Sequence, residues 1–275
     1  MTRRRDAILR EMGLAPLWRL RGAAEEPAVE APPPALPLEA PPARPPEAAR
    51  PPVAASAPAR RPLLPVAEAP ALPAVPPPRV VPAADLAGLG WDALEARILG
   101  CEGCVLCQRR KQAVPGVGDR QADWMFVGEG PGAEEDERGE PFVGQAGRLL
   151  DAMLAAIGLQ RGHDVYIANA VKCRPPNNRT PEADELAACF PYLRRQIELI
   201  QPRLIVALGR PAAQALLNQE VKISAARGKT FRYGDIPVVV TYHPAYLLRN
   251  QPDKAKAWED LCFARKTMRA LRDEA

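Results

Sequence analysis

The chain has 275 residues, of which 33 are proline, and its formal net charge is +4. This small positive excess permits nucleic-acid binding without requiring it, and no run of about eighteen apolar residues predicts a transmembrane helix. The basic residues 1–5 are not followed by an apolar signal-peptide core, so we expect a cytoplasmic protein without a membrane partner. In that reducing compartment, the six cysteines indicate a metal site or catalysis before disulfides.

The first part of the chain divides into two segments of different composition. Residues 1–22 contain a short amphipathic segment, which is either a frayed terminal helix or a peptide that docks on a protein partner. Residues 23–84 hold 20 of the 33 prolines and little aromatic or β-branched bulk, which predicts a disordered Pro/Ala-rich linker. The folded domain is therefore expected at residues 85–275, which suffice for a single core and are expected to act as a monomer.

Four apolar runs in this domain predict buried strands, at residues 124–127, 165–168, 204–208 and 238–241. Between them, apolar residues recur at helical spacing, first over residues 149–157 and later over residues 186–200. Alternation of strands and helices is typical of a parallel sheet that is covered on both faces. We therefore predict an α/β fold with three α/β/α layers and a central, mostly parallel four-stranded sheet.

Residues suited to a functional site stand at the ends of these predicted strands. Glu129 follows the first strand, within the loop GEGPG at residues 128–132. Asn169 ends the second strand, Gly209 follows the third and His243 follows the fourth. Because parallel strands finish at one edge of a sheet, we expect these positions to converge on one crevice. Taken singly, Asn169 or His243 could instead cap a strand end and satisfy local backbone groups.

The cysteines suggest a metal centre without identifying the metal. Three of them lie in the run CEGCVLC at residues 101–107, and a bacterial ferredoxin run would need a fourth cysteine where Lys111 stands. Zinc and an iron-sulfur cluster both suit four thiolates drawn from the sequence as Cys101, Cys104, Cys173 and Cys189. Cys189 also lies on an apolar helical stripe, where a free cysteine is at home. Cys107 and Cys262 look like spare thiols.

Several motifs together carry a family resemblance. GEGPG with the following EED, then RGEPFVGQAG, IANAVKCRPPNNR, LGRPAA and HPAYLLRN resemble, in order and spacing, the family 4 uracil-DNA glycosylases. The resemblance covers residues 99–271 and implies a monofunctional enzyme of base excision repair. Such an enzyme hydrolyses the N-glycosidic bond of a flipped deoxyuridine in DNA and leaves an abasic site. Two other functions stay open, a non-catalytic iron-sulfur module that binds damaged DNA and a sister glycosylase for other deaminated bases.

The same resemblance implies the cofactor, a mainly structural 4Fe-4S cluster held by Cys101, Cys104, Cys173 and Cys189. It further implies roles for residues around the crevice. Phe142 stacks on the flipped uracil and Asn169 reads its edge. Glu129 positions a water and stabilises positive charge on the sugar, while His243 and backbone N–H groups near Gly130 stabilise the departing uracil anion.

Further residues are expected at the edge of the crevice. Glu135 is expected to hold the water or the catalytic carboxylate, and it could help to exclude thymine. Leu247 or Leu248 is expected to wedge into the space that the flipped base leaves, although both leucines could equally be core residues. Arg249 and Arg179 are expected to contact DNA phosphates.

Overall fold

The computed structural model of the protein describes residues 83–274. The predicted docking peptide at residues 1–22 lies outside the described residues, as does all but the end of the predicted linker at residues 23–84. The first described element is a short helix, α2 (Ala83–Leu86). None of the helices in this described part combines the length and the apolar character that crossing a bilayer requires.

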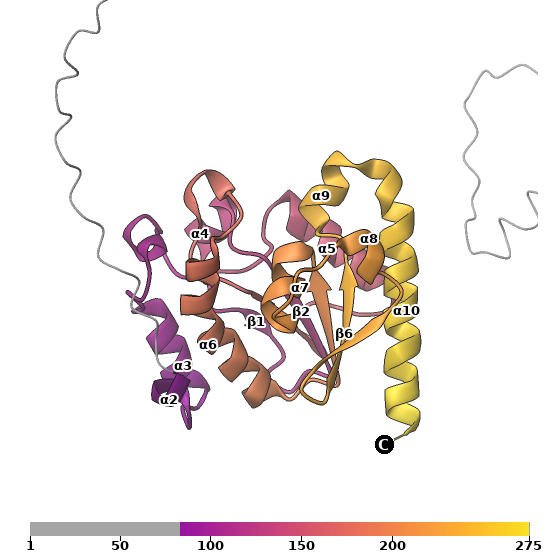
Figure 1. The fold of residues 1–275 in the computed structure, drawn as a ribbon, viewed down its shortest axis with the longest axis horizontal. Coiled ribbons are helices and arrows are strands. Elements are labelled where there is room, and N and C mark those ends of the chain that lie inside the picture. Colours follow the sequence, from indigo (N-terminus) through magenta and orange to yellow (C-terminus); the bar gives the residue numbers. More distant parts are fainter. Residues whose placement is uncertain (1–82, 275) are drawn as a thin grey trace, which may run out of the picture. The chain divides into compact units, whose positions relative to one another are not determined.

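A sheet forms the centre of the fold (Figure 1). Its six strands have the order β1-β3-β2-β4-β6-β5. Its strands are β1 (Val117–Gly118), β2 (Trp124–Gly128), β3 (Val165–Asn169), β4 (Leu204–Leu208), β5 (Thr230–Tyr233) and β6 (Ile236–Thr241). The inner strands β3, β2, β4 and β6 pair in parallel, whereas β1 and β5 pair antiparallel at the two edges. The predicted α/β class and the mostly parallel sheet are confirmed.

The predicted number of four strands is wrong, because both edge strands were missed. The four inner strands coincide with the four apolar runs of the sequence. Strand β1 has only two residues, and β5 alternates exposed and half-buried residues. Neither edge strand is buried on both faces, so neither shows the continuous apolar run that marks a strand in the middle of a parallel sheet.

Helices cover both faces of the sheet, which confirms the three layers (Figure 1). The larger ones are α3 (Trp91–Leu99), α5 (Gln145–Ala156), α6 (Ala183–Ile200), α7 (Arg210–Leu217) and α10 (Lys254–Asp273). The shorter ones are η1 (Val105–Gln108), α4 (Ala133–Arg138), η2 (Pro176–Asn178), α8 (Ile223–Ala226), α9 (Pro244–Arg249) and η3 (Gln251–Asp253). Trp124 and Phe126 of β2 pack in one core with α5 and α10, whereas Met125 and Val127 pack in the other with α6 and α7. Alternate residues of one buried strand therefore serve two cores.

A third group of buried residues lies between α3 and α6. It includes Leu94 and Ile98 of α3, Tyr192 of α6, and the two cysteines Cys173 and Cys189. These side chains connect the amino-terminal helices of the domain to the loop that follows β3. The cysteines are therefore held near the carboxyl end of β3, where Asn169 stands.

Candidate active site

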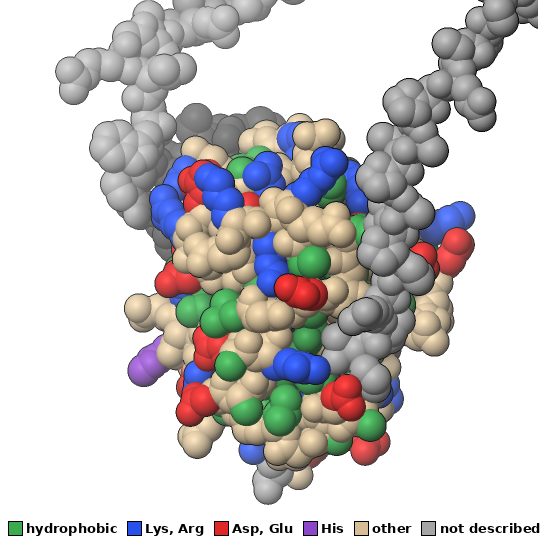
Figure 2. Space-filling model, turned by 90° about the vertical axis from the view of Figure 1, so that its left-hand side faces the viewer, with side chains coloured by type: hydrophobic (Ala, Val, Ile, Leu, Met, Phe, Trp, Pro, Cys, Tyr) green, Lys and Arg blue, Asp and Glu red, His purple; other side chains and the backbone are tan. Residues whose placement is uncertain are grey.

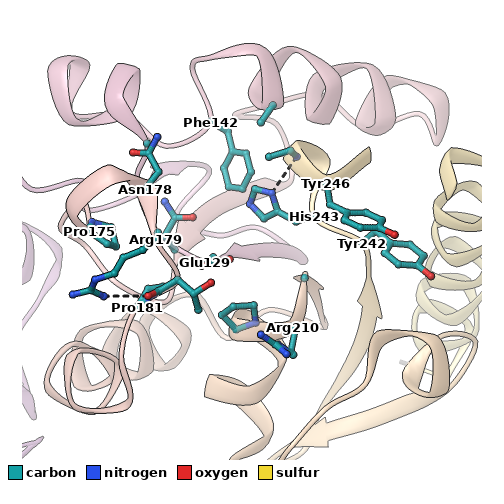
Figure 3. A pocket seen from close by; sticks show the side chains of 18 of the residues that line it. Glu129, Phe142, Pro175, Asn178, Arg179, Pro181, Arg210, Tyr242, His243 and Tyr246 are labelled. Carbon is teal, nitrogen blue, oxygen red and sulfur yellow. Dashed lines mark hydrogen bonds between the residues drawn. The ribbon is translucent and has the colours of Figure 1, made fainter. Parts of the chain in front are cut away.

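A cavity of about 840 Å³ opens where the parallel strands end. Its walls include Glu129 after β2, Asn169 at the end of β3 and His243 after β6. Phe142 from the loop before α5 completes this side of the cavity (Figure 3). Gly209, which follows β4, also lines the cavity, so the four strand-end positions converge on one crevice as predicted.

Glu129 is half-buried in the loop between β2 and α4. Burial raises the pKa of its carboxyl group, while the Thr180 side chain and the positive charge of Arg210 oppose that shift. Arg210 is exposed at the start of α7 and lines the same cavity (Figure 3). Removing a carboxylate from water raises its pKa because the charged form loses hydration. The site therefore raises the pKa of this carboxyl group, and a shifted pKa is typical of functional acids.

Phe142 is held in an unusual backbone conformation. Its φ angle is +55°, a left-handed value that costs a non-glycine residue on the order of 1–3 kcal/mol. Its ring is buried and stacks on the His243 ring, with centroids 5.4 Å apart and planes 29° apart. Gly128 makes room for this ring, because a Cβ atom at that position would lie 2.5 Å from Phe142 and 2.4 Å from the Asn169 Oδ1 atom. The backbone of β2 thus approaches both side chains closely.

Asn169 lines the cavity and carries a buried hydrogen-bond acceptor without a partner. The residue is 2% exposed, and its Oδ1 atom has no partner. Among the residues that the structure describes, no other buried side-chain nitrogen or oxygen lacks a hydrogen bond. An unpaired buried acceptor is destabilising, so its persistence points to a ligand that donates to it. Behind it, the buried Lys172 donates from Nζ to the Asn169 carbonyl oxygen at 3.0 Å.

His243 is held as a neutral donor. It is the N-cap of α9, and its Nδ1 atom accepts a hydrogen bond from the Ala245 N–H at 3.1 Å. The proton of the neutral ring therefore sits on Nε2. Burial lowers the pKa of His243 to about 4, the nearby charge of Arg249 acts in the same direction, and Glu135 opposes the shift. The imidazole is thus uncharged near neutral pH and has one N–H group available.

Glu135 is engaged with backbone groups. One carboxylate oxygen accepts from the Gly132 N–H at 3.0 Å, and the other accepts from Val143 at 3.0 Å and Gly144 at 3.2 Å. These contacts join the GEGPG loop to the loop that carries Phe142. The predicted direct role of Glu135 in catalysis stays a prediction.

One predicted DNA contact is corrected by its surroundings. Leu247 is 1% exposed within the core, so a wedge at this position is wrong, because a fully buried side chain cannot enter the DNA. Leu248 is half-buried and Arg249 is exposed on the same helix, so both stay available. Arg179 pairs with Glu185 at 2.8 and 2.7 Å, and its predicted phosphate contact stays a prediction.

The four predicted cluster ligands line one small cavity of their own, together with Cys107. Three N–H donors point at their sulfur atoms. Arg110 donates to Cys173 at 3.0 Å, the Lys172 backbone donates to Cys189 at 3.1 Å, and the Gly103 backbone donates to Cys101 at 3.4 Å. Within residues 83–274, no three His, Cys, Asp or Glu side chains form the compact group that a single metal ion needs. The donor set fits thiolate ligands, whose sulfurs commonly accept N–H hydrogen bonds at iron-sulfur clusters.

Some cavity residues were missed from the sequence. Arg210 follows the predicted strand end at Gly209, so its position after that glycine was the available signal. Thr180 lies in the cavity wall just before α6, which begins at Ala183. The role of Lys172 depends on its burial, which no local pattern of the sequence reveals.

Comparison with known proteins agrees with the family that the motifs indicated. A family model described as the uracil DNA glycosylase superfamily matches residues 115–262. The type-4 uracil-DNA glycosylase of Pyrobaculum aerophilum is 45% identical over 178 residues, covering 62% of this chain and 90% of the relative. That of Archaeoglobus fulgidus is 48% identical over 165 residues, covering 57% and 82%. That of Thermotoga maritima is 46% identical over 167 residues, covering 60% and 86%. The chain therefore belongs to the type-4 uracil-DNA glycosylases, within the uracil-DNA glycosylase superfamily.

Proposed function

We propose that this chain removes uracil from DNA by hydrolysing the N-glycosidic bond of a flipped deoxyuridine, which releases free uracil and leaves an abasic site. The observation that carries the proposal is the unpaired Oδ1 atom of Asn169, a residue that lines the same cavity as Glu129. The N3–H group of uracil is a donor of the kind that this buried acceptor lacks. Family membership supports the same activity.

Asn169 would discriminate between bases by its donor and acceptor pattern. Its Oδ1 atom would accept from uracil N3–H, and its amide group would donate to O4. Cytosine has an acceptor at N3 and a donor at C4, so the same amide would face like groups. A buried site that leaves polar groups unpaired can reject such an analogue by several orders of magnitude. Phe142 would supply the stacking surface for the flipped ring.

Cleavage of the bond produces a positive charge on the sugar and a negative charge on uracil. One side chain of the cavity is suited to stabilise each charge. When the bond between C1′ and N1 breaks, the electron pair leaves with uracil and the sugar becomes cationic. Glu129 would stabilise this cation and take a proton from the water whose oxygen bonds to C1′. The His243 Nε2–H group would donate to uracil O2, where negative charge develops. The uracil anion then takes up a proton from solvent.

The DNA would reach the cavity at the carboxyl ends of the parallel strands. Lys and Arg side chains gather toward the top of Figure 2, which is the end where these strands finish in Figure 1. On α9, the half-buried Leu248 would fill the gap left by the flipped base, and the exposed Arg249 would contact phosphate. With Leu248 in the gap, the base would stay outside the duplex while the cavity binds it.

We also propose that a 4Fe-4S cluster is bound by Cys101, Cys104, Cys173 and Cys189. Support comes from the common cavity that these residues line and from the N–H groups that point at three of their sulfurs. Iron-sulfur clusters in general supply electron transfer or structural bracing, and the hydrolysis requires no electron. The cysteines would therefore brace the loop at residues 101–107 against the segment that follows Asn169.

The expected monomer, the cytoplasmic location and the protein partner of residues 1–22 stay predictions. The activity is tested with purified full-length protein on oligonucleotides that carry a single uracil, thymine, hypoxanthine or xanthine. We expect release of uracil from single strands and from U·G duplexes, and no release of thymine. Absence of uracil release from both substrates would refute the proposed function. Release of hypoxanthine or xanthine without uracil would instead identify a sister activity.

A further inference from the structure

Phe142 occupies a backbone conformation that its own residue type disfavours, and it lies between a cationic and an anionic side chain. Its φ angle is +55°, in the left-handed region that favours glycine. The ring is nevertheless fixed in place, 6% exposed and stacked on His243. A conformation of this kind persists only where the surroundings enforce it. The contacts that enforce it here come from both sides of the loop.

On the carbonyl side, one guanidinium group holds the loop. Arg161 donates from Nη1 to the Pro141 carbonyl oxygen at 2.9 Å and from Nη2 to the Phe142 carbonyl oxygen at 2.8 Å. Its Nε atom donates to Asp151 of α5 at 3.0 Å. The planar fork of arginine matches two neighbouring acceptors at once, which lysine cannot reproduce. The two peptide carbonyls that flank the strained residue are thus tied to one rigid group.

On the amide side, Glu135 accepts from the N–H groups of Val143 and Gly144 at 3.0 and 3.2 Å. The start of α5 also approaches closely, since a Cβ atom at Gly147 would lie 1.7 Å from the Phe142 carbonyl oxygen. Arg161 and Glu135 therefore hold successive peptide groups of one turn. Gly147 allows α5 to approach that turn closely.

We infer that Arg161 is a positioning residue for the reaction, which acts by holding Phe142 where its ring can stack on the flipped uracil. Arg161 does not line the cavity itself, so its influence on the base passes through Phe142. The inference rests on the proposed function, in which Phe142 is the stacking surface. If the role of Arg161 were purely structural, its ion pair with Asp151 would only join α5 to the turn before β3.

A double-mutant cycle in the full-length protein separates these roles. Arg161→Met removes the donors and keeps the aliphatic stem, and Phe142→Leu removes the aromatic surface. We expect Arg161→Met to lower kcat/KM for uracil release from a single-stranded oligonucleotide about tenfold to a hundredfold, the range in which small misplacements act. In the Phe142→Leu background, the same change is expected to cost less than about threefold, because coupled residues are not additive. Equal losses in both backgrounds would overturn the inference.

A matched control and a milder variant complete the test. Asp151→Asn removes the ion pair but leaves the two carbonyl contacts of Arg161, and we expect its kcat/KM to stay near the wild-type value. Arg161→Lys keeps the charge without the fork, and we expect it to recover little activity. The lysine variant carries the same cycle if Arg161→Met does not fold. A lowered Tm with unchanged kcat/KM in either Arg161 variant would overturn the positioning role. If the wild-type protein releases no uracil, the proposed function fails instead.

Discussion

Asn169 shows how much chemistry one buried residue can specify. Its Oδ1 atom has no partner inside the protein, while its own carbonyl is held by Lys172. The side chain is thus presented on a fixed backbone, and its selectivity follows from the orientation of a single amide.

We predict that Asn169→Leu, a change of similar volume, lowers kcat/KM for uracil release by about 10²- to 10⁴-fold, because uracil N3–H and O4 would be buried without partners. Steady-state kinetics on a single-stranded substrate measures this loss. Asn178→Ala is the matched control, since Asn178 lines the same cavity but its side chain bonds to Arg174. Equal losses in the two variants would contradict the role of Asn169.

The pH dependence of the reaction reports on Glu129 and His243. Burial raises the pKa of Glu129. As the pH falls, this carboxylate therefore becomes protonated at a higher pH than an exposed glutamate does. The pKa of His243 is lowered to about 4, so the imidazole stays neutral well below its ordinary range. We predict a single-turnover rate that rises as Glu129 ionises and then stays level through pH 8. A rate that fell as pH rose through about 6.5, where free histidine titrates, would show that imidazolium is the active form.

At the scale of elements, α9 carries two adjacent leucines with different surroundings. We predict that Leu247→Ala destabilises the fold by about 2–5 kcal/mol, since it leaves a cavity in the core. Leu248→Ala should leave stability unchanged and reduce uracil release from duplex more than from single-stranded DNA, because only the duplex needs a wedge. Thermal unfolding and parallel assays on both substrates measure the two effects. Equal losses on both substrates for Leu248→Ala would argue against the wedge.

The proposed cluster ligands come from the loop at residues 101–107, from the segment after β3 and from α6. We predict that Cys173→Ser loses bound iron, visible absorbance and thermal stability, because it removes one proposed thiolate ligand. Cys107→Ser is the matched control and should keep all three, although Cys107 lines the same cavity. Iron analysis and visible absorbance of the two purified variants measure this difference. Loss of iron in Cys107→Ser with retention in Cys173→Ser would reassign the ligands.

At the scale of the whole molecule, the sequence predicts the features that depend on local pattern. The inner strands are apolar runs, and Glu129, Asn169 and His243 stand at strand ends, so topology alone brings them to one cavity. The edge strand β5 was missed, because half of its residues face solvent. The pairing of Arg179 with Glu185 also depends on the conformation of the segment before α6, which residue type does not reveal.

This cavity, assembled from distant segments, is proposed to hydrolyse the glycosidic bond through Glu129. The most direct measurement compares wild-type protein with Glu129→Gln, which keeps the shape and removes the charge, and uses the exposed Glu134→Gln as the control. We predict that Glu129→Gln binds uracil-containing DNA as the wild type does and releases uracil on the order of 10²- to 10⁴-fold more slowly. The Glu134→Gln rate should stay unchanged. Uracil release by Glu129→Gln at the wild-type rate would contradict the account.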